Sequence, residues 1–410
     1  MKRVQIRKII IGVSLILLFL WIGGIIYTFA FGLKSWGLTS KTVWGVEIVN
    51  FVFWIGNSHA GTLISAILYL LRQDWRKSIH RIAETFTIIS ILIAGIYPLL
   101  HLGRPWLFYW MFPIPNQMQT WANFKSPLIW DFIAILTYII LSFLFLTLGI
   151  IPDYDKIKFK KKNSLGNAIN NFFEKIWLGS LNNWNEYKWT YHIFAGILTF
   201  VVISVHSIVS YDFSVSILPQ WHSTMLPVFF VVGAIYSGVA LLLICTTLLN
   251  SISSFGKRIN QIALNNLSKM LLGFSLVFLY FYILELFFQF YSQNQYEQWI
   301  YSLRFQNEYK IIFFIMCILI FAIPQFFWFR KLRENKVVQF LIALSVLVGM
   351  WLERYILIVP VLSADFVTKQ TINYTPSLLD IILTFGSLGF FVIVFYAIGK
   401  RIPMVPIYED

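Results

Sequence analysis

Residues 127–151 read PLIWDFIAILTYIILSFLFLTLGII, and Asp131 is the one charged residue in this stretch. A helix of this length rises about 37 Å, which is enough to cross the hydrocarbon core of a bilayer. The stretch therefore predicts a membrane-spanning helix that carries a carboxyl group near one end.

Nine further stretches have the same length and character. Of the 410 residues, 58% are apolar and only 12% are charged, whereas soluble proteins carry about 25% charged residues. We therefore predict an all-α integral membrane protein with ten transmembrane helices. The first of them follows a basic N-terminus without a cleavage-site pattern, so we expect it to be a retained anchor. The predicted spans are 9–32, 44–71, 79–101, 127–151, 187–211, 226–250, 268–291, 310–329, 336–359 and 379–399.

A weak internal repeat divides these spans into groups. Gly56 and Gly61 in the second span are matched at a constant offset by Gly233 and Gly238 in the sixth. This pattern predicts two four-helix bundles flanked by single helices. The expected units are an N-terminal anchor helix over 1–33, a first bundle with the ligand site over 34–215, a second bundle over 216–370, and a last helix with its tail over 371–410.

Basic residues are distributed unevenly between the two sides of the predicted spans. The two termini and the even-numbered loops hold 24 of the 32 Lys and Arg residues. By the positive-inside rule, both termini should be cytoplasmic in a bacterial inner membrane. The same bias accounts for the net charge of +14, so we expect a lipid bilayer and no nucleic acid as partner. The outer loops 102–126 and 212–225 are rich in aromatic residues and carry few charges, so we expect a partner subunit to dock on them.

The two cysteines restrict the redox chemistry that this chain can hold. Cys245 and Cys317 both lie in apolar runs, so we expect no disulfide framework, no metal site and no iron–sulfur cluster on this chain alone. If electrons pass through the protein, a partner must carry them onward.

Ionisable side chains gather at the predicted outer face. His101, Asp131, His206 and Asp212 all lie near the outer ends of their spans. Carboxyl and imidazole groups together can take up two protons in succession near neutral pH, which matches the loss of two protons and two electrons by a quinol. We expect Ser126 to cap the span that carries Asp131, with Pro127 at its first helical position. Adjacent opposite charges at residues 353 and 354 predict packing between helices.

Several strings in this sequence, in chain order, are similar to those of a known family. They are WIGNSHAGTLISAILYLLR (54–72), PLLHLGRPW (98–106), FPIPN (112–116), SPLIWD (126–131), VHSIVSYDF (205–213), WHST (221–224), PQFFW (324–328) and GMWLER (349–354). Over nearly the whole chain they resemble the NrfD/PsrC family, and within it the ten-span ActC-type subunit of alternative complex III.

The resemblance implies a haem-free quinone- or menaquinone-binding subunit of a respiratory oxidoreductase, active only with its partners. It implies an extracytoplasmic iron–sulfur subunit that takes the electrons, together with a multihaem cytochrome c and other membrane subunits. Proton translocation is a further hypothesis, and a membrane anchor of a menaquinone-reducing or sulfur-compound reductase is the alternative within the family. The expected quinone-binding residues are His101, Asp131, Asp212, Arg104 and His206, and the expected proton route runs through His59, Glu84 and His192.

Two other classes stay open on the sequence alone. His192 and His206 are 14 residues apart on one span, about 21 Å along a helix, a spacing suited to ligands of two stacked haems in a cytochrome b. Buried carboxyl groups and a possible repeat also fit a secondary transporter, although such sites lie at the membrane midplane.

Overall fold

The computed structural model describes residues 2–39, 42–154, 180–252, 259–372 and 374–407. Ten of its helices are long and apolar enough to cross a membrane, and they match the ten predicted spans in order. The all-helical fold is therefore confirmed. The basic residues of 155–179 and 253–258, which entered the prediction of orientation, lie outside the described residues.

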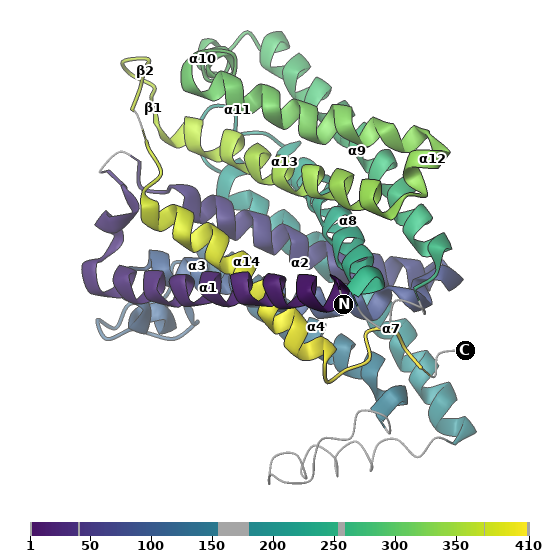
Figure 1. Cartoon of the computed structure of the whole chain (residues 1–410). Helices are drawn as coiled ribbons and strands as arrows, with labels where there is room; N and C mark the ends of the chain where they lie inside the picture. Colours follow the sequence, from purple (N-terminus) through teal and green to yellow (C-terminus); the bar gives the residue numbers. More distant parts are fainter. Residues whose placement is uncertain (1, 40–41, 155–179, 253–258, 373, 408–410) are drawn as a thin grey trace.

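The helices and strands succeed one another along the chain with defined bounds, and most are labelled in Figure 1. They are α1 (Lys2–Phe31), η1 (Leu33–Trp36), α2 (Val46–Leu70), η2 (Asp74–Ser78), α3 (His80–His101), η3 (Pro105–Met111), α4 (Pro127–Ile150), η4 (Ile151–Asp153), α7 (Leu181–Ser214), α8 (Leu226–Ile252), α9 (Gln261–Tyr291), α10 (Gln295–Leu303), α11 (Asn307–Cys317), η6 (Ile318–Ala322), η7 (Ile323–Trp328), α12 (Arg330–Arg333), α13 (Lys336–Leu362), β1 (Ala364–Asp365), β2 (Gln370–Thr371) and α14 (Leu378–Gly399).

Helices α2 and α8 form the centre of the molecule. Helix α2 packs against α3, α7 and α8, and α8 packs against α2, α7, α9 and α13. The repeated glycines explain this close approach, because Gly56 faces Ala234 of α8 while Gly238 faces Ala60 of α2. Small residues at such a crossing let two membrane helices come together.

The remaining helices lie around this centre. Helices α1 and α14 cross each other in Figure 1 and pack against each other. Helix α13 contacts α8 and α11 of the predicted second bundle and α2 of the predicted first bundle. It therefore links these two sets of helices. The eighth span is not a regular helix, because α11 is followed by a π turn over Ile318–Ala322 and by η7, which contains Pro324. Proline removes a backbone donor and cannot continue a regular helix.

Two elements at the predicted outer end differ from expectation. Helix α7 continues to Ser214, so Asp212 lies inside its last turn rather than beyond it. The short amphipathic α10 follows α9 without having been predicted as a helix. The predicted outer end of the bundle is the end that holds His101, and the predicted inner end is the end that holds Arg76.

Candidate functional site

The carboxyl groups of Asp131 and Asp212 meet at the predicted outer end. Asp131 lies near the start of α4, Asp212 lies near the end of α7, and these two helices pack against each other. Pro127 occupies the first turn of α4 as predicted, whereas Ser126 stands at the cap position without a side-chain hydrogen bond to the helix. Asp131 is 5% exposed, and its carboxyl group forms a side-chain hydrogen bond with that of Asp212.

Two hydrogen-bonded carboxyl groups must share a proton, because two adjacent anions repel each other in a poorly hydrated site. In each of the two carboxyl groups, Oδ1 is buried and receives no hydrogen bond from an N–H or hydroxyl group of the described residues. A buried acceptor of this kind calls for a donor from water or a ligand. The pair can therefore accept a hydrogen bond from a ligand hydroxyl and can hold a proton that the ligand releases.

His101 and Arg104 have surroundings different from those of the carboxyl pair. The ring of His101 is half-buried, with its centroid 6.1 Å from that of Trp36 and 5.8 Å from that of Trp44. Arg104 is exposed, just before η3. Of the predicted quinone-binding residues, the structure thus brings Asp131 and Asp212 into direct contact. His101 is held by two tryptophans.

His206 lies deeper in the membrane and pairs with His59. The Nδ1 atoms of the two rings are 2.9 Å apart, and Nε2 of His206 lies 2.9 Å from the carbonyl oxygen of Phe230. Because a carbonyl oxygen only accepts, His206 donates from Nε2 and accepts at Nδ1, so His59 donates from Nδ1. This arrangement leaves Nε2 of His59 as a buried acceptor without a hydrogen-bond partner among the described residues.

Hydroxyl groups continue from this histidine pair toward the predicted inner end. The ring of Tyr138 lies 4.5 Å from that of His59. The hydroxyl of Tyr138 donates to Ser58 O at 2.7 Å and to Thr62 Oγ1 at 2.9 Å. Thr62 in turn donates to Thr87 Oγ1 at 3.3 Å. Since Tyr138 and Asp131 are seven residues apart on α4, these hydroxyls begin about 10 Å below the carboxyl pair.

One helical turn further along α2, Ser65 contacts a third ionisable group. Glu84 of α3 accepts from Ser65 Oγ at 2.7 Å and from the Tyr191 hydroxyl at 2.9 Å. Arg76 Nη1 lies 3.5 Å from that same hydroxyl. We call this line of side chains the polar ladder; its members are His206, His59, Tyr138, Thr62, Thr87, Ser65, Glu84 and Tyr191.

A cavity of about 670 Å³ opens where the polar ladder reaches the predicted inner end. Arg76, Tyr69 and His192 are among the residues that line it, and the ring of His192 lies 5.9 Å from that of Tyr69. The predicted proton-route residues therefore occupy two levels: His59 and Glu84 within the ladder, and His192 at this inner cavity.

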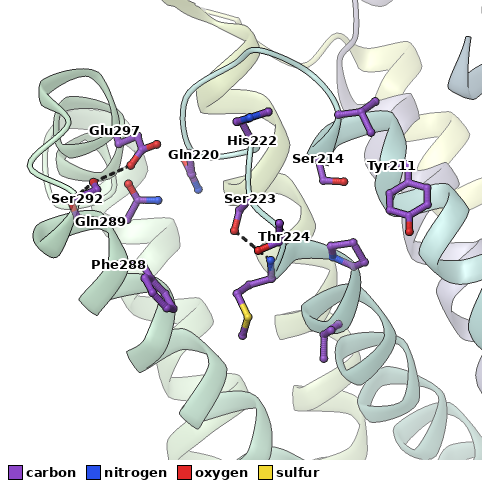
Figure 2. Close-up of a pocket in the computed structure, with 14 residues that line it drawn as sticks. Tyr211, Ser214, Gln220, His222, Ser223, Thr224, Phe288, Gln289, Ser292 and Glu297 are labelled. Atoms are coloured by element: carbon purple, nitrogen blue, oxygen red, sulfur yellow. Dashed lines mark hydrogen bonds between the residues drawn. The ribbon is translucent and has the colours of Figure 1, made fainter. Parts of the chain in front are cut away.

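A second cavity, of about 770 Å³, lies at the predicted outer end. Figure 2 shows Tyr211 and Ser214 on one side of it, His222 and Ser223 over it, and residues of α9 and α10 opposite. Tyr211 precedes Asp212 in the sequence, but neither Asp131 nor Asp212 lines the cavity. His222, in the outer loop 212–225, lines this cavity and is exposed.

The structure also contains a second carboxyl pair, which was not predicted from the sequence. Glu47 of α2 and Asp380 of α14 share a side-chain hydrogen bond. Tyr374 donates to Asp380 Oδ2 at 3.0 Å, and Asn50 donates to Glu47 Oε2 at 3.1 Å. Burial and the neighbouring Asp380 carboxyl raise the pKa of Tyr374 above its ordinary value, so its phenol stays a neutral donor. This pair attaches α14 to α2.

Within the described residues, no group of three or more His, Cys, Asp or Glu side chains is positioned to hold a metal ion. Both ring nitrogens of His206 already face hydrogen-bond partners, namely His59 and the Phe230 carbonyl. A haem ligand needs one ring nitrogen free for iron, and this geometry therefore disfavours the arrangement of a cytochrome b.

Comparison with known families agrees with the membrane-spanning helices described above. Residues 34–364 match the family described as polysulphide reductase, NrfD. The chain belongs to the NrfD family and is a multi-pass membrane protein with ten candidate spans.

Two relatives are named as components of reductases. The C subunit of the selenate reductase of Mesobacillus selenatarsenatis is 25% identical over 392 residues, which cover 92% of this chain and 89% of that protein. A protein of Halobacterium salinarum, provisionally named as the C membrane subunit of a dimethyl sulfoxide reductase, is 24% identical over 272 residues, 66% of this chain and 58% of its own length. These relatives support the NrfD/PsrC resemblance but do not single out the ActC type.

Proposed function

We propose that this chain is the quinone-interacting membrane subunit of a multi-subunit reductase in a bacterial inner membrane, with both termini in the cytoplasm. In this proposal, quinol is oxidised at the Asp131–Asp212 pair and its electrons pass to an extracytoplasmic iron–sulfur subunit. The observation that carries the proposal is the buried, hydrogen-bonded carboxyl pair, which can accept a hydrogen bond and a proton from a quinol hydroxyl. His101 and Arg104 would complete the site from the end of α3, and we propose them as secondary contacts.

The stoichiometry of the reaction fits the capacity of this pair. A quinol gives up two protons and two electrons when it becomes a quinone. A pair that already shares one proton has room for one more, so the two protons leave in succession, each passing from a carboxyl oxygen to outer water. Both electrons pass to the partner's iron–sulfur cluster, because this chain supplies no acceptor in our proposal.

The names of the two relatives favour a reductase complex over an alternative complex III. If the chain serves a reductase, the final acceptor is of the kind named for the relatives, an oxyanion or an S-oxide. The ActC-type role, with a multihaem cytochrome c as partner, is the second candidate, and the ten spans support it. Haem staining and mass spectrometry of the purified complex distinguish the two, since only the second requires a c-type cytochrome among the copurified subunits.

We further propose that the polar ladder admits protons from the inner cavity to the His59–His206 pair. Hydrogen bonds join Glu84 to Ser65 and Tyr191, and Thr62 to Tyr138 and Thr87. These two groups lie one helical turn apart on α2 and α3, a distance that one ordered water can bridge. The ladder would then be the input side of a proton route coupled to quinol oxidation.

Replacing Glu84 with Gln tests this input route. We expect the wild-type complex in vesicles to release more than two protons outward per quinol oxidised, and Glu84→Gln to lower the number toward two. The amide keeps the shape of the side chain but cannot take up and release a proton. The measurement is outward acidification divided by quinol oxidised in the same vesicles. A wild-type value of two, or an unchanged value in the variant, contradicts the route.

A further inference from the structure

Arg354 is a buried cation whose role the proposed function leaves unassigned. It is 3% exposed on α13, and its Nη1 atom lies 3.3 Å from Oε2 of Glu353, which is fully buried. A Cβ atom at Gly233 of α8 would come within 2.6 Å of Arg354 Nη2. The glycine thus leaves the space that the guanidinium occupies, so α8 is shaped to hold a charge at this place.

Phe230 connects this charge to the polar ladder. The guanidinium carbon of Arg354 lies 4.3 Å from the centre of the Phe230 ring, while the Phe230 carbonyl accepts the hydrogen bond from His206. Phe230 thus places the guanidinium of Arg354 near the His206 imidazole, where a positive charge repels an imidazolium. Arginine stays protonated in proteins, so this repulsion of positive charge is permanent.

A proton that travels along the polar ladder would have to rest on His206 before it moved on. A proton that enters at Nε2 of His59 would push the Nδ1 proton of His59 onto Nδ1 of His206. His206 would then be an imidazolium, and its Nε2 proton would have to leave the Phe230 carbonyl for water to move on. This imidazolium would also stand beside the guanidinium of Arg354 in a medium of low dielectric constant.

The other groups around His206 do not offset this repulsion at the ring itself. Helix α2 contributes the neutral His59, and α8 contributes the backbone of Phe230. On its own helix, Asp212 is six residues away, about 9 Å along the axis, and shares a proton with Asp131. Glu353 is the ion-pair partner of Arg354, but of these two charged groups it is the guanidinium of Arg354 that lies against the Phe230 ring.

We propose that Arg354 is an electrostatic gate that stops protons of the polar ladder at the His59–His206 pair and keeps them from the carboxyl pair at rest. The gate builds on the ladder of the proposed function but not on quinol oxidation. It separates water at the predicted inner end from the site where a quinol would release its protons. Passage would then require the charge to move away from His206.

Passive proton leak tests the gate without any quinol. The purified complex is placed in sealed vesicles that contain a pH-sensitive dye, and a pH step is applied with a potassium–valinomycin clamp. We expect Arg354→Gln to raise the leak rate about tenfold or more over wild type, because a full unit charge no longer opposes the imidazolium. Arg354→Lys keeps a positive charge at this position, so its leak rate should stay close to that of wild type.

Four further variants separate a gate from damaged packing. The double variant Glu353→Gln/Arg354→Gln leaves no unpaired buried charge, so it should assemble and leak as the single variant does. Adding His59→Phe to the single variant Arg354→Gln or to the double variant should return the leak rate to that of wild type, since the proton route then lacks the ring nitrogens of His59. Arg304→Gln removes another buried arginine, whose partners are Glu285 and Tyr301, and should not leak.

Two results would overturn the proposal. The first is a wild-type leak rate in the double variant Glu353→Gln/Arg354→Gln. The second is a leak that persists at full rate after His59→Phe is added. Neither result bears on quinol oxidation at Asp131, which is measured by turnover, so a failure of the gate is distinguishable from a failure of the proposed function.

Discussion

Asp131→Asn should abolish quinol turnover, with a loss of about 10²–10⁴-fold, while the complex still assembles. The loss has the size typical of removing a positioned proton acceptor. Asparagine keeps the shape of the side chain and can still hydrogen-bond to Asp212, but its amide cannot share or store a proton. The measurement is the rate of quinol-dependent reduction by the purified complex, normalised to the amount of assembled complex.

Glu47→Gln is the matched control for this experiment. Glu47 is also a buried carboxyl at the predicted outer end, and it is also paired, in its case with Asp380. It contacts α14 rather than α7, so we expect its loss to leave turnover within about twofold of wild type. Normal turnover in Asp131→Asn would remove Asp131 from the site, and equal losses in both variants would indicate a structural effect of deleting any buried carboxyl group.

The spans could be predicted from the sequence because a bilayer imposes a length and an apolar composition on every crossing helix. The residues at which the spans begin and end were predicted less accurately. Helix α7 continues to Ser214 and α9 begins at Gln261, beyond the apolar runs that marked them, because polar residues are compatible with a helix once it leaves the hydrocarbon. The amphipathic α10 was missed because it has nine residues, too few to cross a membrane.

The site was predicted in part. Asp131 and Asp212 could be placed at one end of the bundle from topology alone, and that they touch follows from the packing of α4 against α7. The contact between His59 and His206 was not predictable, since it depends on how far each helix is rotated about its own axis. The hydroxyls of Tyr138 and Thr62 carried no sequence signal, because Tyr and Thr are common in membrane helices and only their alignment distinguishes them.

At the predicted inner end, Arg81 forms a buried ion pair that joins three parts of the chain. Its Nη1 atom lies 2.6 Å from Asp153 Oδ2 and 3.0 Å from Pro403 O, and its Nη2 atom lies 2.6 Å from Gly149 O. Asp153 also accepts from the backbone of Ile407 at 2.9 Å. The side chains of Arg81 and Asp153 are 1% and 0% exposed, so neither can recover hydration if its partner is lost.

Arg81→Met should therefore lower the free energy of unfolding by about 3–5 kcal/mol, because it removes the buried cation that faces the Asp153 carboxylate. Arg330→Met is the matched control. Its pair with Glu334 at 2.8 Å has side chains 80% and 42% exposed, and an exposed pair contributes only about 0–1 kcal/mol. The measurement is unfolding of the purified chain in mixed micelles as the fraction of SDS is raised.

The double variant Arg81→Met/Asp153→Leu should regain part of the lost stability, since it removes both charges of the buried pair. If Arg81→Met and Arg330→Met lowered the free energy of unfolding equally, the buried Arg81–Asp153 pair would contribute no more to stability than an exposed ion pair.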